Sequence, residues 1–340
     1  MNAEERYKLD TLDKELLQHL QDKFPLAKRP WAEIGKRLGI TEEEVLSRSE
    51  RLSSDGVIRK LRTILNGQKV GGCASTLMAM RVPAEKMEKV VSIVNEYMSV
   101  THNYQREHDY NLWFTVTTCG GKDLRSTVDE IKGRTGIPDS DVLDLPTTRV
   151  FKVDVRFKFT DFKDDSDRNE ISIPNERTKM NKDDEPNETD QAILRAAQEG
   201  LPVVKEPFAG IAREVGISQD EVIARLKRLI SNGVIKRLGI SINQRKVGIV
   251  ANAVVAWRVP QEQVERVGKM LSSYKEVTHC YERVTIPGKW EHNLFTVIHG
   301  YNRESVEEMA KRLSEVVGIS DYLVLFSNEQ FKRTSVMHPY

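Results

Sequence analysis

The sequence predicts an α+β fold made of two tandem repeats that pack against each other as a pseudo-dimer within one chain. The segment from Asp13 to Arg106 aligns without a gap on the segment from Asp190 to Arg283. Within each copy, a helical part with capping signals precedes a part in which strand and helix patterns alternate. The copies are much longer than the units of a solenoid, so we expect two homologous units.

Composition narrows the class of protein. Charged residues make up 30% of the 340 residues, but the net charge is only +1. A nonspecific binder of polyanions normally carries a larger basic excess, so nucleic acid is not expected as a partner, although a local patch could still be basic. No apolar run is long enough to span a membrane and no signal peptide is visible, which predicts a cytoplasmic protein without a membrane partner.

The three cysteines form no CxxC pair and are odd in number. We expect all of them to be buried thiols in a reducing compartment rather than a disulfide or a zinc site. They are Cys73, Cys119 and Cys280.

Composition shifts divide the chain into five parts. The central stretch is acidic, contains prolines and has few large apolar residues, so it cannot offset the entropy of ordering and is expected to be a flexible linker. The expected parts are a winged helix-turn-helix at 1–65, a ferredoxin-like domain at 66–160, the linker at 161–188, a second winged helix-turn-helix at 189–242 and a second ferredoxin-like domain at 243–340.

Capping signals predict the helix-turn-helix. Asp13 is the expected N-cap of a first helix, and Gly39 ends a second helix over 31–38. Thr41 and Glu44 form a capping box at the start of a third helix. After that helix, Val57 and the residues that follow are expected to form a β-hairpin wing, and the second repeat carries the same signals.

Alternating patterns predict the second part of each repeat. The order strand, helix, strand, strand, helix, strand is that of a ferredoxin-like domain. In the first repeat we expect these elements at 73–82, 85–97, 99–106, 111–118, 124–134 and 150–159.

The helical part resembles the Lrp/AsnC winged helix-turn-helix through Ile34-Gly-Lys-Arg-Leu-Gly-Ile40, Arg48, Arg51, Gly56-Val-Ile58 and Lys69-Val-Gly71. The part that follows resembles the effector-binding domain of that family. The resemblance covers nearly the whole chain apart from the linker.

One motif in each repeat carries candidate chemistry. Residues two apart on a strand share a face, so an imidazole, a phenol and a guanidinium project together in each copy. If the two halves pair through these faces, both triplets line one cavity; the alternative is a core tyrosine beside a solvated arginine. The triplets are His102, Tyr104 and Arg106, and His279, Tyr281 and Arg283.

These residue types suit a large polycarboxylate. Arginine recognises carboxylates in a bidentate manner, and histidine can donate a proton or bind iron. Apolar neighbours such as Trp113 could flank a flat ligand. A tetrapyrrole with several carboxyl groups fits this combination better than a small amino acid.

The motif THxYxR, followed by Asn111-Leu-Trp-Phe-Thr115 in one half and by His292-Asn-Leu-Phe-Thr296 in the other, resembles siroheme decarboxylases. The first repeat resembles the A-type subunit and the second the B-type subunit, here fused. The resemblance implies removal of CO2 from the C12 and C18 acetates of siroheme to give 12,18-didecarboxysiroheme, for heme or d1-type heme. It implies no metal site and no cofactor beyond the iron-containing substrate.

The resemblance and the residue types together assign roles. His102 or His279 is the expected general acid. The expected substrate-binding residues are Tyr104, Arg106, Tyr281, Arg283, His292, Trp113, Lys236 and Arg237. Lys236 and Arg237 could equally contact phosphates or water, and the loop 284–291 before His292 could cover a ligand or be a plain surface hairpin.

Two further groups are weaker candidates. His299 is expected to be structural, and Lys332 and Arg333 could reach the same cavity from the last strand.

A DNA-binding regulator that responds to heme or another small effector is the alternative function. The third helix of the first repeat begins Thr41-Glu-Glu-Glu44, which is unfavourable beside phosphates. Two unequal helices would also mismatch a palindromic operator. A noncatalytic tetrapyrrole carrier and a homodimer of the fused chain remain open.

Overall fold

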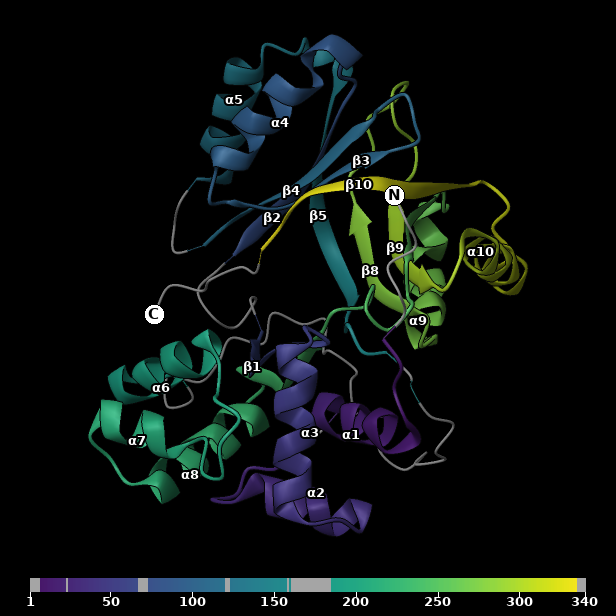
Figure 1. The fold of residues 1–340 in the computed structure, drawn as a ribbon. Coiled ribbons are helices and arrows are strands. Elements are labelled where there is room, and N and C mark those ends of the chain that lie inside the picture. The colour runs from purple at the N-terminus through teal and green to yellow at the C-terminus, as the bar shows by residue number, and fades with distance from the viewer. Residues whose placement is uncertain are drawn as a thin grey trace.

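The computed structural model describes residues 7–22, 24–66, 73–119, 123–157, 159 and 185–334. Figure 1 shows six helices of the two helix-turn-helix parts below and the strands with their covering helices above, with β1 between them. Most of the expected linker lies outside the described residues; of its last part, Glu188 already begins a helix. No described helix is long and apolar enough to cross a membrane.

Each repeat begins with three helices. They are α1 (Thr11–Asp22), α2 (Pro30–Leu38) and α3 (Glu42–Ser54), and α6 (Glu188–Glu199), α7 (Ala209–Val215) and α8 (Gln219–Ser231). The expected cap at Thr41 is confirmed, since its side chain accepts a hydrogen bond from the Glu44 amide. Gly39 adopts the left-handed conformation at the end of α2, as predicted.

The predicted N-cap of the first helix is wrong by three residues. The Asp10 carboxylate accepts the Asp13 amide at 2.6 Å, and the Asp13 carboxylate accepts the Asp10 amide at 3.3 Å. Asn187 and Asp190 make the same reciprocal pair in the second repeat. Asp13 is therefore the third residue of a capping box and not the cap itself.

The wing is built differently from the expected hairpin. Strand β1 (Ile58–Leu65) pairs antiparallel with β6 (Ile235–Ile242), so each repeat supplies one strand of a shared ribbon. Helix α1 packs on β6 and α6 packs on β1, each against the strand of the other repeat. One hydrophobic core consequently runs through both helix-turn-helix parts.

The two α+β domains form one closed barrel of eight strands. The first contributes β2 (Ala74–Met80), β3 (Val100–Arg106), β4 (Leu112–Thr118) and β5 (Val142–Val153), and the second contributes β7 (Ala251–Trp257), β8 (Val277–Arg283), β9 (Leu294–Gly300) and β10 (Tyr322–Arg333). Short 3-10 turns lie at Ala84–Lys86, Asp139–Asp141 and Gln261–Gln263. The covering helices are α4 (Met87–Glu96), α5 (Leu124–Thr135), α9 (Val264–Ser273) and α10 (Arg303–Val317).

The last strand of each domain joins the two sheets. Residues 142–146 of β5 pair with β2 of the same repeat, and residues 147–153 pair with β8 of the other repeat. Strand β10 likewise pairs first with β7 and then with β3. The predicted strand at 150–159 thus begins earlier and ends earlier, because the pairing partner changes along it and Pro146 interrupts the apolar pattern. The expected intrachain pseudo-dimer is confirmed.

The cysteine prediction is wrong for two of the three residues. Cys73 and Cys119 form a disulfide, whereas Cys280 is a buried free thiol. The register of β2 and β4 explains the disulfide. Ala74 is paired with Thr118, Cys73 directly precedes Ala74, and Cys119 directly follows Thr118. This proximity comes from strand pairing and cannot be read from sequence spacing. Burial raises the pKa of Cys280 to about 12, so this thiol is unreactive at neutral pH.

Candidate active site

Both predicted triplets face the interior of the barrel. The neighbours that alternate with them point outward: the Asn103 amide donates to the Asn95 side chain on α4 at 3.0 Å, and Cys280 packs under α9. Figure 1 shows β3 and β8 in the barrel wall, one from each repeat. The closed barrel therefore brings the two triplets into one shared interior.

Each triplet forms a stack of rings and cation. The His102 and Tyr104 rings lie 6.3 Å apart, and the Arg106 guanidinium lies 5.3 Å from the Tyr104 ring centre. In the second repeat the corresponding distances are 5.8 Å and 5.2 Å. In both repeats the distance from the guanidinium to the phenol ring is in the range of cation–π contacts. Each tyrosine ring therefore lies between the histidine and the arginine of its triplet.

Arg106 and Arg283 are buried cations with no anion beside them among the described residues. Each is 6% exposed and donates one hydrogen bond to a backbone carbonyl on the neighbouring strand, at Leu325 and Leu145 respectively. Neither has a carboxylate partner within the described residues, and the Nε of each is buried without a hydrogen bond. Burial lowers the pKa of both to about 10, so both stay charged at neutral pH. A buried unpaired charge is costly, which makes this interior receptive to an anionic ligand.

The two histidines are held neutral. Burial, reinforced by the charge of Arg333, lowers the pKa of His102 to about 4. Burial lowers the pKa of His279 to about 3, and electrostatic interaction contributes, first with the neighbouring imidazoles of His299 and His102 and then with Arg333 and Lys236. Both imidazoles are consequently unprotonated at neutral pH in the protein without ligand.

The Thr278 hydroxyl holds one edge of the His279 ring. It lies 3.0 Å from Nδ1 of His279 and 3.3 Å from the Val297 carbonyl. Nδ1 is therefore engaged by the hydroxyl, and Nε2 is the nitrogen that stays available to a substrate. His102 makes the same contact with Thr101 at 2.9 Å.

A rim of cations surrounds the histidine end of the barrel. Burial lowers the pKa of Lys236, whose side chain has no hydrogen bond or ion pair within the described part of the chain. The Nε of Arg62 is buried and unbonded. Arg333 donates to the Gln244 side chain at 2.8 Å. The local charge is strongly basic although the chain as a whole is nearly neutral.

Arg237 has a different role from its neighbour Lys236. It donates to the backbone carbonyls of Gln21 at 2.6 Å and Val155 at 3.2 Å. It thereby ties the end of α1 and the segment after β5 to the ribbon. Arg237 therefore lies at the edge of the site, where its guanidinium stabilises the fold through bonds to backbone carbonyls.

Trp113 and His292 lie toward the other end of the barrel. Trp113 is opposite Tyr104 in the register, and its indole donates to the Tyr110 carbonyl at 2.6 Å. It also packs on Trp290, with ring centres 5.4 Å apart. Trp290 is buried and belongs to the loop 284–291, which therefore closes this end as an apolar plug.

The structure does not bring His292 to His102 or His279. Its Nε2 lies 3.3 Å from the Asp321 carboxylate, without the alignment of a hydrogen bond, and its ring lies beside Trp290. Burial lowers its pKa.

Three residues of the site were missed or underrated from the sequence. His299 lies on the interior face of β9, with Nδ1 buried and unbonded and with the Phe157 ring 5.6 Å away. Arg333 reaches the site from β10, and Arg62 on β1 lies near Arg237 at its edge. The alternation of Phe295, Val297 and His299 was the one available signal, because residues two apart share a face.

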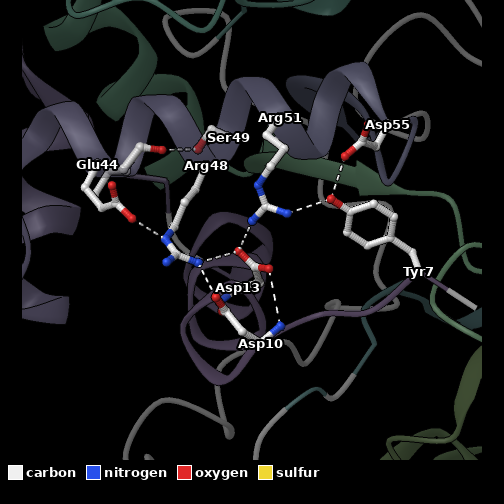
Figure 2. A network of polar contacts seen from close by, with 9 residues as sticks. Tyr7, Asp10, Asp13, Glu44, Arg48, Ser49, Arg51 and Asp55 are labelled. Carbon is white, nitrogen blue, oxygen red and sulfur yellow. Dashed lines mark hydrogen bonds and ion pairs between the residues drawn. The ribbon is translucent and has the colours of Figure 1, made fainter.

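Arginines of the third helices are used within the protein. Figure 2 shows Arg48 and Arg51 converging on the Asp13 carboxylate, at 2.9 Å and 2.6 Å. Asp13 is 1% exposed, so α1 and α3 are clamped by a buried ion pair network. Arg225 and Arg228 hold the buried Asp190 in the same way in the second repeat. These cations are committed to carboxylates of the protein instead of phosphates.

Comparison with known proteins agrees with this architecture. An AsnC-like ligand binding domain model matches residues 69–152 and 246–332. A model described as the siroheme decarboxylase NirDL-like HTH domain matches residues 13–59 and 190–236. Both models therefore match twice, once in each repeat.

Full-length relatives extend the match to nearly the whole chain. The siroheme decarboxylase of Hydrogenobacter thermophilus is 31% identical over 95% of this chain and 93% of its own length. The NirDL subunit of Paracoccus pantotrophus is 34% identical, with 96% of each chain covered. The siroheme decarboxylase beta subunit of Methanosarcina barkeri is 48% identical over 44% of this chain, which is about one repeat, and over 97% of its own length.

A solved structure has the same fold. The siroheme decarboxylase NirDL in co-complex with an iron-uroporphyrin III analogue aligns with a TM-score of 0.68 and 29% identity, covering 96% of this chain and 94% of that chain. With two repeats of the matched domains and full-length relatives above 30% identity, the chain belongs to the siroheme decarboxylase family.

Proposed function

We propose that this protein is a carboxy-lyase that removes CO2 from the C12 and C18 acetate side chains of siroheme and forms 12,18-didecarboxysiroheme. The observation that carries the proposal is the set of buried cations with no ion-pair partner among the described residues, beside two neutral imidazoles. Siroheme is a flat ring with many carboxylates, and its charge complements that set.

Charge complementarity supports binding of this substrate. Arg106 and Arg283 are buried and have no carboxylate partner in the described ranges, and Lys236 makes no ion pair there. Charge-assisted hydrogen bonds from such groups to carboxylates are about twice as strong as neutral ones. Ligand carboxylates at these positions would replace the missing anions and relieve the cost of burying the charges.

The chemistry requires one proton for each CO2. Protonation of a ring carbon next to the acetate provides an electron sink, and the C–C bond to the carboxylate then breaks with release of CO2. A second protonation at the former CH2 carbon and loss of the ring proton restore the ring and leave a methyl group. The net uptake is one proton for each acetate.

The histidines are suited to carry that proton once substrate is bound. In the free protein, positive neighbours and burial keep the pKa of His102 and His279 low. Substrate carboxylates beside Arg333 and Lys236 would cancel part of the positive field, which raises both pKa values toward the working pH. An imidazole with a pKa near the operating pH is an effective general acid.

Anaerobic incubation of the purified protein with siroheme, followed by mass spectrometry, tests the proposal. We expect successive loss of two CO2 in the natural protein and no loss in a His102→Ala/His279→Ala double variant. Siroheme that binds but stays unchanged with the natural protein would contradict the proposal and indicate a tetrapyrrole carrier or sensor.

A further inference from the structure

The two halves of the site differ at a pair of equivalent strand positions. Arg333 on β10 lies directly opposite His102 on β3. The equivalent position on β5 is Val153, which lies directly opposite His279 on β8. One histidine therefore has a guanidinium on the neighbouring strand, and the other has an isopropyl group.

At a second pair of equivalent positions, it is the half with His279 that carries the additional ionisable side chain. Trp113 and Phe295 occupy matching places, each opposite the tyrosine of its repeat. Counting along the strands from these residues, His299 on β9 corresponds to Thr117 on β4. The half that lacks the arginine thus carries a second imidazole.

The geometry places His299 next to His279. His279 is opposite Val297, and His299 follows two residues later on the same face, so the two side chains are diagonal neighbours across β8 and β9. Such neighbours have Cα atoms about 7–8 Å apart, within reach of two imidazole side chains. Because the Nδ1 of His299 is buried without a partner, this ring makes no hydrogen bond through that atom within the described residues.

The position of Arg333 is fixed while its charge stays available. Gln244, just after the ribbon strand β6, accepts one hydrogen bond from its Nη1 at 2.8 Å. No carboxylate of the described residues forms an ion pair with it, and its charge acts on His102, His279 and His299. A neutral partner can orient a guanidinium without neutralising it.

We propose that the two halves have different tasks: Arg333 binds a side-chain carboxylate of the substrate beside His102, and His299 supports proton delivery by His279. This proposal rests on the proposed function. Arg333 is a binding residue, and His299 is a positioning residue that acts through His279. Two observations support this division: the strand pairing that places each residue, and the differences at the equivalent positions Arg333/Val153 and His299/Thr117.

The pseudo-symmetry supplies matched variants. Arg333→Val and His299→Thr each replace a residue with the one that the other repeat has at the same place, so both side chains are compatible with the barrel. Arg333→Lys keeps the charge but not the planar group. Arg312→Gln removes an exposed arginine on α10 and serves as the control.

Steady-state kinetics with siroheme and absorbance titration with iron uroporphyrin III, which needs no turnover, test the division. For Arg333→Val we expect KM and the uroporphyrin Kd to rise at least tenfold with kcat within threefold, because a charge-assisted hydrogen bond is lost. For His299→Thr we expect kcat to fall at least tenfold with the Kd unchanged, because a step of proton delivery is impaired. Arg333→Lys should recover part of the affinity.

The outcomes separate this inference from the proposed function. If the natural protein decarboxylates siroheme but both variants change the same parameter, or neither variant differs from Arg312→Gln, the division of tasks is wrong. If the natural protein binds uroporphyrin without acting on siroheme, the proposed function fails, and with it the role of His299 in proton delivery.

Discussion

The Thr278 hydroxyl engages Nδ1 of the His279 ring at 3.0 Å and lies 3.3 Å from the Val297 carbonyl, so it holds one edge of the imidazole. A proton that this ring passes to a substrate is therefore carried on Nε2, while Nδ1 remains bonded to the hydroxyl.

Removal of that hydroxyl should impair the reaction. We expect Thr278→Val to lower kcat about tenfold, since the loss of about 1 kcal/mol of orienting hydrogen bond frees the ring. Thr278→Ser keeps the hydroxyl and should retain most of the activity. Siroheme turnover by mass spectrometry is the measurement, and equal rates in the two variants would show that the hydroxyl does not orient the ring.

Stability should fall as the pH drops below neutrality. The pKa values of His279 and His102 are about 3 and about 4 in the folded protein and near 6.5 when unfolded. The unfolded chain thus binds more protons between these values, so the free energy of unfolding declines from about pH 6.5 toward pH 3. Over that whole window each group contributes on the order of 3–5 kcal/mol.

Urea unfolding of the natural protein and of His279→Asn at several pH values measures this effect. The variant should match the natural protein in the steepness of unfolding at each pH but lose stability less as the pH falls. Parallel pH dependence in the two proteins would refute the assignment of a buried neutral imidazole.

The ion pairs under the helix-turn-helix parts should be structural. Asp190 is fully buried and is held by Arg225 and Arg228. Loss of its charge leaves two partly exposed arginines without their partner, so we expect Asp190→Asn to destabilise the protein by about 2–4 kcal/mol. The midpoint of thermal unfolding is the measurement. Asp220→Asn, at an exposed position on α8, is the control and should leave the midpoint within a degree or two.

Duplex DNA should bind weakly and without site preference. Arg48 and Arg51 are bound to Asp13 (Figure 2), and three glutamates begin α3. We expect fluorescence anisotropy to show affinity that falls steeply with salt and is the same for unrelated duplexes, as for nonspecific binding. A preference of about a thousandfold for one sequence would restore the regulator as a function.

The disulfide should stabilise the first repeat. Cys73 and Cys119 close a loop with a sequence separation of 46, for which chain entropy predicts up to about 4 kcal/mol. Reduction, or a Cys73→Ser/Cys119→Ser double variant, should lower the unfolding midpoint. Alkylation of the unreduced, denatured protein should modify Cys280 alone; modification of all three thiols would show that the bond does not form.

Local patterns predicted much of this structure. The two repeats, the N-cap at Thr41 and the shared face of His102, Tyr104 and Arg106 all follow from sequence patterns. The helical stop at Gly39 does as well. Such features depend on short-range sterics and hydrogen bonds, which the sequence shows directly.

What the sequence did not predict depends on pairing between distant segments. The ribbon of β1 and β6, the exchange of partners along β5 and the disulfide each join strands from different parts of the chain. The same pairing brings Arg333 to His102 across 231 positions of sequence. Residue spacing does not show these contacts. Lys236 and Arg333 could be named as candidates, but their positions beside the histidines could not be predicted.

The exchanged strands have a consequence for how the protein can diverge. Because both halves lie on one chain, every molecule contains one of each, at any dilution and in fixed proportion. A substitution in one repeat is therefore not duplicated at the equivalent position of the other repeat. The position occupied by Val153 in one copy and Arg333 in the other shows this freedom: a symmetric dimer would have to carry two arginines or none. Fusion turns a duplicated scaffold into an asymmetric receptor, which suits a ligand whose own ring substituents are unequal.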